Sequence, residues 1–141
     1  MKELIGHKIE GIFISKQESR LQFKTNKGVI TYDTEAGCCS ETWFADILNP
    51  EDIIGQTITE VDDSGDYDWC EVDETYSVDD GRTRQDYDSV YGYVLNSIKG
   101  SCDIIFRNSS NGYYGGSIYL KKDIKKIEAG AKEITQDWFA N

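Results

Sequence analysis

The sequence predicts a single, mainly β domain (class α+β), with about seven antiparallel strands and one or two short helices. Three observations support this prediction. Short segments rich in Ile, Phe, Val and Tyr recur along the chain, turns containing glycine separate them, and two stretches of the chain match each other. The chain has 141 residues, a length typical of one domain with its own core. We therefore treat residues 1–141 as one domain.

The strand predictions depend on alternation and on turn residues. Leu21 and Phe23 alternate with polar neighbours, as in a strand with one buried face. Gly28 follows Asn-Lys and can adopt the positive φ that a tight hairpin turn needs. Strands are expected at residues 11–15, 20–25, 29–33, 56–61, 91–97, 102–108 and 117–121.

An internal repeat is predicted, with copies at residues 3–48 and 52–121. Residues 3–12 align with residues 52–61, because each has an acid, two apolar residues, a glycine, and apolar residues three and six positions after that glycine. In each copy a strand, a Lys-Gly turn and another strand follow, which predicts two related three-stranded meanders. The alternative explanation is that a hairpin glycine makes any two meanders look alike.

Two short helical segments are expected. Residues 41–48 (ETWFADIL) follow a capping candidate, Ser40, and Thr42 is a second candidate. Asn49-Pro50 comes directly after them, and a residue before proline avoids helical backbone angles. This pattern predicts a helix over Glu41–Leu48, and a further helical turn is expected near residues 133–139.

The acidic residues are concentrated in one segment. The chain has 26 Asp and Glu against 15 Lys and Arg, a formal net charge of −11. Residues 62–88 contain eleven of these acids and only two bases. This acidity argues against a broad surface for the DNA or RNA backbone, which needs Lys and Arg to displace counterions, so we expect no direct binding to nucleic acid. The segment is too long for an ordinary hairpin loop, which predicts an acidic flap that is functional or partly disordered.

The cysteines and the single histidine indicate neither a metal centre nor a catalytic pair. Cys38 and Cys39 are adjacent, Cys70 and Cys102 stand alone, and no Cys-x-x-Cys or Cys/His spacing occurs. We expect packing roles for the cysteines, with a reactive thiol as the alternative. Because His7 stands near no nucleophile in the sequence, we expect a protein without enzymatic activity, metal or cofactor.

No run of about 18 apolar residues is present, which predicts a protein that does not cross the membrane. The first ten residues, MKELIGHKIE, also lack the apolar core of a signal peptide. The expected location is therefore the cytoplasm.

Residues 107–116 (RNSSNGYYGG) are the strongest candidate for a binding site. The arginine ends an apolar strand, where its guanidinium can pair with a phosphate. The asparagines supply uncharged donors and acceptors, the tyrosines supply flat faces on which a base can stack, and the glycines allow close backbone approach. The alternative is a glycine-rich hairpin with packed tyrosines. The expected ligand-binding residues are Arg107, Asn108, Asn111, Tyr113 and Tyr114, with Arg82 and Arg84 closing over the ligand.

Residues 37–44 (GCCSETWF), residues 91–93 (YGY) and residues 107–116 together resemble a family of small acidic domains of bacteriophages and prophages. The resemblance extends from Leu4 to Phe139. It implies a phage protein in the host cytoplasm, and small phage proteins of this kind often inhibit host defence. The favoured expectation is a non-catalytic sponge that sequesters a nucleotide-derived immune signal of the cyclic nucleotide or cyclic ADP-ribose type. The alternative is a nucleic-acid mimic, similar to anti-CRISPR proteins, that binds a host protein through residues 62–88.

A homodimer is expected from the C-terminal region. Trp138 and Phe139 need burial, either against their own sheet or against a second copy. The lysines of residues 121–126 follow an expected edge strand and are opposite in charge to the acidic flap. Opposite charges on one chain favour a self-complementary contact between two copies.

Overall fold

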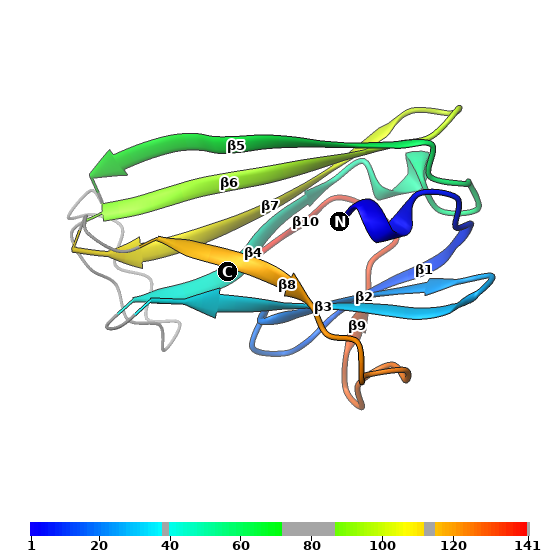
Figure 1. Cartoon of the computed structure of the whole chain (residues 1–141), viewed down its shortest axis with the longest axis horizontal. Helices are drawn as coiled ribbons and strands as arrows, with labels where there is room; N and C mark the ends of the chain where they lie inside the picture. Colours follow the sequence, from blue (N-terminus) through cyan, green and yellow to red (C-terminus); the bar gives the residue numbers. More distant parts are fainter. Residues whose placement is uncertain (38–39, 72–86, 112–114, 141) are drawn as a thin grey trace.

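The computed structural model describes residues 1–37, 40–71, 87–111 and 115–140, and for residues 64–71 it describes the backbone. Within these residues, ten strands form two five-stranded antiparallel sheets that face each other (Figure 1). The only helical elements described are two 3-10 turns, η1 (Lys2–Leu4) and η2 (Pro50–Asp52). The predicted class, mainly β, is confirmed, and the described strands outnumber the predicted ones.

Sheet 1 contains the first predicted meander. Its order is β8-β3-β2-β1-β9. Leu21 and Phe23 of the middle strand are completely buried, as their alternation predicts, and Tyr32 packs edge-to-face on Phe23. Gly28 has a φ of 116° and closes the predicted hairpin. The strands are β1 (Ile9–Ile14), β2 (Arg20–Thr25), β3 (Gly28–Ala36), β8 (Gly116–Leu120) and β9 (Lys132–Glu133).

Sheet 2 contains the second predicted meander, in the order β10-β4-β7-β6-β5. Its β6–β7 turn is the predicted Lys-Gly hairpin, in which the Ser97 N–H donates to the Gly100 carbonyl at 2.8 Å. Leu95, Cys102 and Ile104 on the inner face are completely buried. The strands are β4 (Glu41–Leu48), β5 (Glu60–Glu71), β6 (Tyr87–Asn96), β7 (Ser101–Ser110) and β10 (Trp138–Phe139).

The two halves of the chain exchange their fourth strands. β4 follows β3 along the chain but pairs with β7, whereas β8 follows β7 but pairs with β3. The segments before β1 and β5 are also bonded reciprocally. The Gly6 N–H donates to the Ile58 carbonyl at 2.8 Å, and at the aligned positions the Gly55 N–H donates to the Ile9 carbonyl at 2.7 Å. The arrangement is pseudo-twofold; duplication of one ancestral unit stays a prediction.

The two helices predicted at residues 41–48 and near residues 133–139 are both wrong, because these residues form strands. Residues 41–48 form β4, which lies between β7 and β10. A register shift between Phe44 and Asp46 interrupts the strand, so buried side chains occur at consecutive positions, including Trp43 and Ala45. A strand that is covered on both faces and contains a bulge loses its alternation and imitates helical spacing. Residues 133–139 hold parts of β9 and β10 in place of a helical turn.

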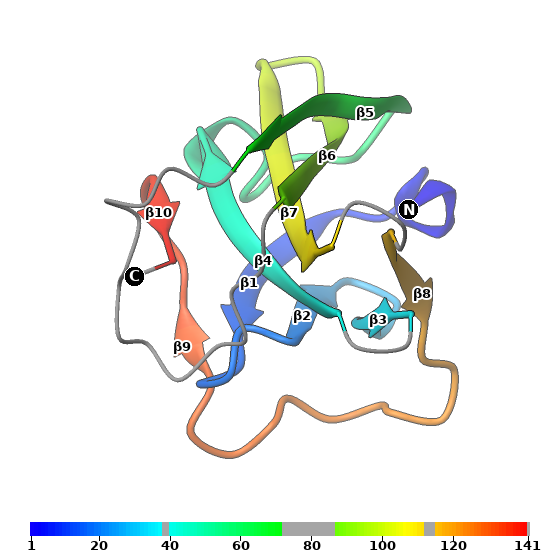
Figure 2. The same ribbon diagram turned by 90° about the vertical axis from the view of Figure 1, so that its left-hand side faces the viewer.

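The C-terminal segment wraps around sheet 1 and closes one side of the sandwich (Figure 2). The Gln22 side chain donates to the Lys126 carbonyl at 2.7 Å and accepts from the Glu128 N–H at 2.8 Å. β9 then pairs with β1 and β10 pairs with β4, so residues 134–137 pass from one sheet to the other. Ile134 is buried, and Trp138 packs against the core. The tail therefore packs within its own chain as far as Trp138, whereas the Phe139 side chain is 59% exposed.

Both ends of the segment predicted as an acidic flap belong to strands. Residues 62–71 continue β5, and residues 87 and 88 begin β6. Arg82 and Arg84 lie in residues 72–86, outside the described residues.

Candidate functional site

The inner face of β7 changes from apolar to polar along its length. Cys102, Ile104 and Phe106 face the core at one half of the strand. Asn108 and Ser110 continue the same face and are 0% and 1% exposed. Because buried polar groups need hydrogen-bond partners, the residues around this half of the strand must supply donors and acceptors. We call the region where β3, β4, β7 and β8 meet around Asn108 the polar end.

The amide group of Asn108 organises the polar end. Its Nδ2 donates to Ser40 Oγ at 3.1 Å and to Thr42 Oγ1 at 3.0 Å. Thr42 Oγ1 in turn donates to the Glu35 carbonyl at 2.9 Å. The Oδ1 atom of Asn108 is buried and has no hydrogen-bond partner among the described residues. A buried acceptor without a donor costs about 1–3 kcal/mol, so this oxygen is suited to accept a hydrogen bond from a ligand.

A glycine allows the two sheets to approach closely beside Asn108. A Cβ atom at Gly116 would meet the Thr42 side chain and would lie 3.0 Å from the Cβ of Asn108. The Gly116 N–H donates to Tyr91 Oη at 3.3 Å, which links β8 to β6 across the sandwich. The Tyr91 ring stacks on Phe106, with centroids 4.9 Å apart and planes 12° apart. Tyr91 therefore marks the boundary between the polar end and the apolar core.

Arg107 faces outward, on the other side of sheet 2 from Asn108, because neighbouring residues of a strand point to opposite faces. Its Nη1 lies 3.9 Å from Oδ2 of Asp88, whose side chain is almost completely buried. Asp46 lies on the same outward face. Burial raises the pKa of the Asp46 carboxyl, and the Arg107 charge opposes this shift. Two carboxylates therefore share the arginine charge, which reduces the charge available to a phosphate.

The structure does not bring the predicted binding residues together on one surface. Arg107 and Asn108 belong to β7, not to a loop, and point to opposite faces. Asn111 is exposed just beyond the strand. Tyr113, Tyr114, Arg82 and Arg84 lie outside the described residues.

Sequence reasoning missed the roles of Thr42 and Tyr91 at the polar end. The helix predicted over residues 41–48 makes Thr42 a capping candidate and hides its place on the inner face of a strand. Strand alternation from Glu41 onward would have placed Thr42 on the same face as Phe44, and thus inside the sandwich. For Tyr91 the sequence signal was only its place in an aromatic strand, because the contact with Gly116 joins two strands far apart in the chain.

Cys102 and His7 both lie away from the polar end. Cys102 is at the opposite half of β7, and burial raises the pKa of its thiol, which disfavours the reactive thiolate. His7 lies in the junction between the two halves of the chain, where its carbonyl accepts from the Ile58 N–H at 3.0 Å. No group of three or more His, Cys, Asp or Glu residues in the described part of the chain is placed to hold a metal ion.

None of the helical turns in the described ranges has the length and apolar character required to span a membrane.

Comparison with known proteins identifies the family of the chain but no individual relative. No curated protein matches the chain, and no solved structure matches it. The model of one family, described as a domain of unknown function, matches residues 2–120. The match begins at η1 and ends with the last residue of β8, so it includes both meanders and the two exchanged strands. The chain therefore belongs to the DUF7448 family.

Proposed function

We propose that this protein is a non-catalytic phage sponge, which binds and sequesters a small nucleotide-derived immune signal at the polar end in the host cytoplasm. The observation that carries the proposal is Oδ1 of Asn108, which is buried and accepts no hydrogen bond among the described residues. Bases and riboses offer N–H and O–H donors. A donor to this oxygen would remove an energetic cost of about 1–3 kcal/mol.

The other predicted residues take supporting roles. Asn111 is exposed just beyond β7 and provides a second uncharged contact. Arg107 points to the other face of sheet 2, where it balances Asp88 and Asp46, so it contributes positive charge to the region and does not contact a ligand at the polar end directly. The proposed stacking by Tyr113 and Tyr114 and closure by Arg82 and Arg84 involve residues outside the described part of the chain.

The hydroxyl groups beside Asn108 support binding without catalysis. Ser40 Oγ donates to the Gly37 carbonyl at 2.9 Å, and Thr42 Oγ1 donates to the Glu35 carbonyl. A hydroxyl whose proton is bonded to a backbone carbonyl is not deprotonated by a general base, so neither group is activated as a nucleophile. A bound ligand is therefore expected to leave the site chemically unchanged.

The test is a thermal-shift screen of the full chain against cyclic dinucleotides and cyclic ADP-ribose isomers. A ligand at about 100 times its Kd stabilises the native state by about 2.7 kcal/mol, which raises the Tm measurably. Heat release followed by mass spectrometry should then return the ligand intact. A cleaved product would contradict the non-catalytic role, and a panel without any Tm shift would contradict the sponge.

Two matched substitutions locate the site. Asn108→Ala should weaken binding about tenfold or more, since the loss of one good hydrogen bond to ligand is worth about 1.4 kcal/mol. Asn96→Ala is the control, because Asn96 ends β6 at the other end of the sandwich and its Nδ2 contacts Asp62 at 2.9 Å. Equal losses from both variants would mean that the ligand does not bind at the polar end.

A second candidate function is an inhibitor that binds a basic host protein. The observation that favours it is the composition of β5, an edge strand with six acids and no base among its twelve residues. Plaque assays on a defended host separate the two functions. A sponge loses its effect with Asn108→Ala and keeps it with Asp62→Asn/Asp63→Asn, whereas an acidic inhibitor shows the reverse, since complementary charges drive such recognition.

A further inference from the structure

A band of aromatic and aliphatic side chains lies along the side of the sandwich between β6 and β8. Phe106 stacks on Tyr91 and also on Tyr93, whose centroid is 6.3 Å away at an interplanar angle of 20°. Ile118 and Leu120 of β8 lie on the inward-facing side of sheet 1, in register with Thr34 and Tyr32. Tyr91, Tyr93, Ile118 and Leu120 are only partly buried. We call these four residues the apolar band.

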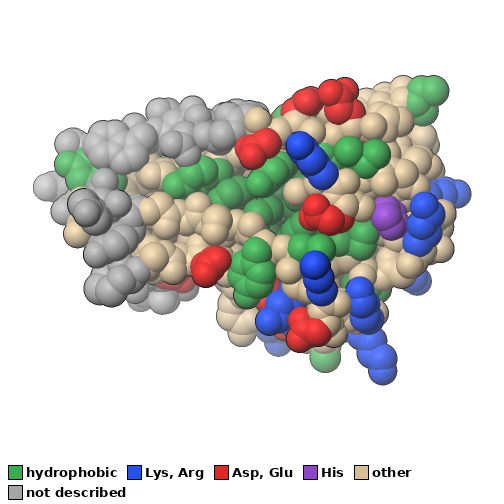
Figure 3. Space-filling model, viewed as in Figure 1, with side chains coloured by type: hydrophobic (Ala, Val, Ile, Leu, Met, Phe, Trp, Pro, Cys, Tyr) green, Lys and Arg blue, Asp and Glu red, His purple; other side chains and the backbone are tan. Residues whose placement is uncertain are grey.

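The band lies on the side of the sandwich opposite the C-terminal tail. β8 and β5 are the edge strands there, whereas β9 and β10 are the edge strands of the other side. On the other side residues 134–137 connect the sheets. On the band side, η1 covers part of the space between the sheets, because Glu3 accepts a hydrogen bond from Tyr32 Oη of sheet 1 and η1 contacts β5 of sheet 2. No strand of the described ranges pairs with the free edge of β8 or of β5. Figure 3 shows the hydrophobic side chains gathered along the middle of this face.

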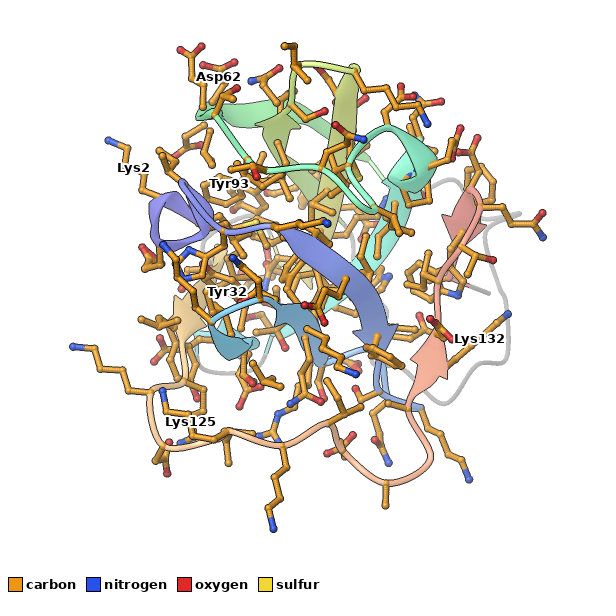
Figure 4. The ribbon with its side chains drawn as sticks, turned by 90° about the vertical axis from the view of Figure 1, so that its right-hand side faces the viewer. Lys2, Tyr32, Asp62, Tyr93, Lys125 and Lys132 are labelled. Atoms are coloured by element: carbon orange, nitrogen blue, oxygen red, sulfur yellow. The ribbon has the colours of Figure 1, made fainter. Side chains whose placement is uncertain are left out.

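Charges of opposite sign border the band. Asp63 is opposite Tyr93 in the pairing of β5 with β6. Burial raises the pKa of the Tyr93 phenol, and the negative charges of Asp63 and Glu3 raise it further. Glu3 also accepts a hydrogen bond from Tyr32 Oη at 3.1 Å. On the other border, residues 121–126 hold four lysines and one aspartate, a net charge of +3. Figure 4 shows Tyr93 and Tyr32 between Asp62, above, and Lys125, below.

The acidic border has the complementary charge. We define it as Lys2, Glu3, Asp62 and Asp63 together with the N-terminal ammonium, which lies 3.9 Å from Oε1 of Glu3. Three acids and two cations give this border a net charge of −1. Figure 4 shows Lys2 on the same side of the molecule as Asp62. The surface therefore runs from negative through apolar to positive.

We propose that the apolar band is the centre of a homodimer interface, in which a second copy packs face to face about a twofold axis that lies in the plane of the contact, at right angles to the line from the acidic border to residues 121–126. Such an axis places the acidic border of each copy against residues 121–126 of the other, and the two bands against each other. A pattern that runs from negative to positive across an apolar centre is self-complementary in this way. A standard interface buries about 800 Å² per partner, which is roughly a tenth of the 7600 Å² accessible surface of this chain.

The test measures mass in solution by light scattering and sedimentation. At about 100 μM and about 0.1 M salt, the full chain should have twice its 16.0 kDa mass. Raising the salt to about 1 M shortens the screening length from about 10 Å to about 3 Å and should weaken the dimer. A chain that remains at its monomer mass at low salt overturns the proposal.

Two charge-reversed variants identify the surface. Asp62→Lys/Asp63→Lys makes both borders positive, and Lys122→Glu/Lys125→Glu makes both negative, so each variant alone should be monomeric. A mixture of the two in equal amounts should form a heterodimer, because every facing pair of borders is then opposite in charge. Lys132→Glu on β9 is the control and should leave the mass unchanged, since Figure 4 shows Lys132 on the opposite side of the molecule.

The mixing experiment also controls for folding, because misfolded variants cannot restore each other. Both variants should melt cooperatively before they are mixed. Folded variants that remain dimeric alone, or that stay monomeric when mixed, would show that another surface holds the copies together. Loss of the dimer by Lys132→Glu would lead to the same conclusion.

Discussion

The two halves of β7 share one strand, one sheet and one pair of neighbours, yet they differ in what they contribute. From Cys102 to Phe106 the inner face is apolar and fully packed. From Asn108 to Ser110 the same face is polar, equally buried, and includes an amide oxygen without a donor among the described residues. Stability is expected to come from the first half, because burial of apolar surface is the main favourable term in folding. The second half keeps a buried acceptor without a donor among the described residues, which is uncommon in folded proteins and which the proposed ligand would satisfy.

The largest expected effect is at the apolar half. Ile104→Ala removes a completely buried side chain and should lower the free energy of unfolding by about 2–5 kcal/mol. Urea denaturation of the two proteins measures this loss. Ile104→Val is the matched control and should cost about 0.5–1.5 kcal/mol. Equal losses from the two substitutions would mean that this half is not tightly packed.

The next largest effect is expected where the sheets approach at the polar end. Gly116→Ala introduces a methyl group against Thr42 and Asn108, and overpacking of this kind costs about 1–3 kcal/mol. Thermal unfolding measures the effect, and Ser117→Ala is the control because Ser117 is exposed on the same strand. A variant with unchanged Tm would show that the polar end is loose enough to accept an extra methyl group.

A smaller effect is expected at Asn108 itself. Asn108→Ala removes two donated hydrogen bonds but also removes the buried oxygen that lacks a donor. Because these contributions oppose each other, the net loss of unfolding free energy should be about 1 kcal/mol, measured by the same urea titration. A loss as large as that of Ile104→Ala would show that the amide mainly maintains the fold, and the contrast between the halves of β7 would disappear.

The smallest effect is expected on the outward face of the apolar half. Burial raises the pKa of the Asp103 carboxyl above its ordinary value of 3.8, so the folded state holds this proton more tightly than the unfolded state. The associated stability is therefore present below the ordinary pKa and is lost as the pH rises through the folded-state pKa. Asp103→Asn should flatten this part of the pH–Tm profile and slightly raise the Tm at neutral pH. A profile identical to that of the unsubstituted chain would contradict this assignment.

Local patterns in the sequence were sufficient to predict the two meanders. Leu21 and Phe23 alternate, and Gly28 adopts the positive φ expected of it. Such features depend on neighbours within a few residues, so they can be inferred before the fold is known. The candidate site was predicted only in part. The sequence drew attention to residues 107–116, but the strand continues to Ser110, which directs Arg107 and Asn108 to opposite faces.

The sequence by itself therefore determined the β class, the hairpin turns and the segment that holds the polar end. The tertiary structure alone decided that residues 41–48 are a strand, because β4 gains its hydrogen bonds and its burial from β7 and β10, which are distant in the chain. It also decided the exchange of β4 and β8 between the halves, and the contacts of Asn108 with Ser40 and Thr42. Pairing between distant strands depends on which surfaces can be buried together, and no local pattern encodes that choice.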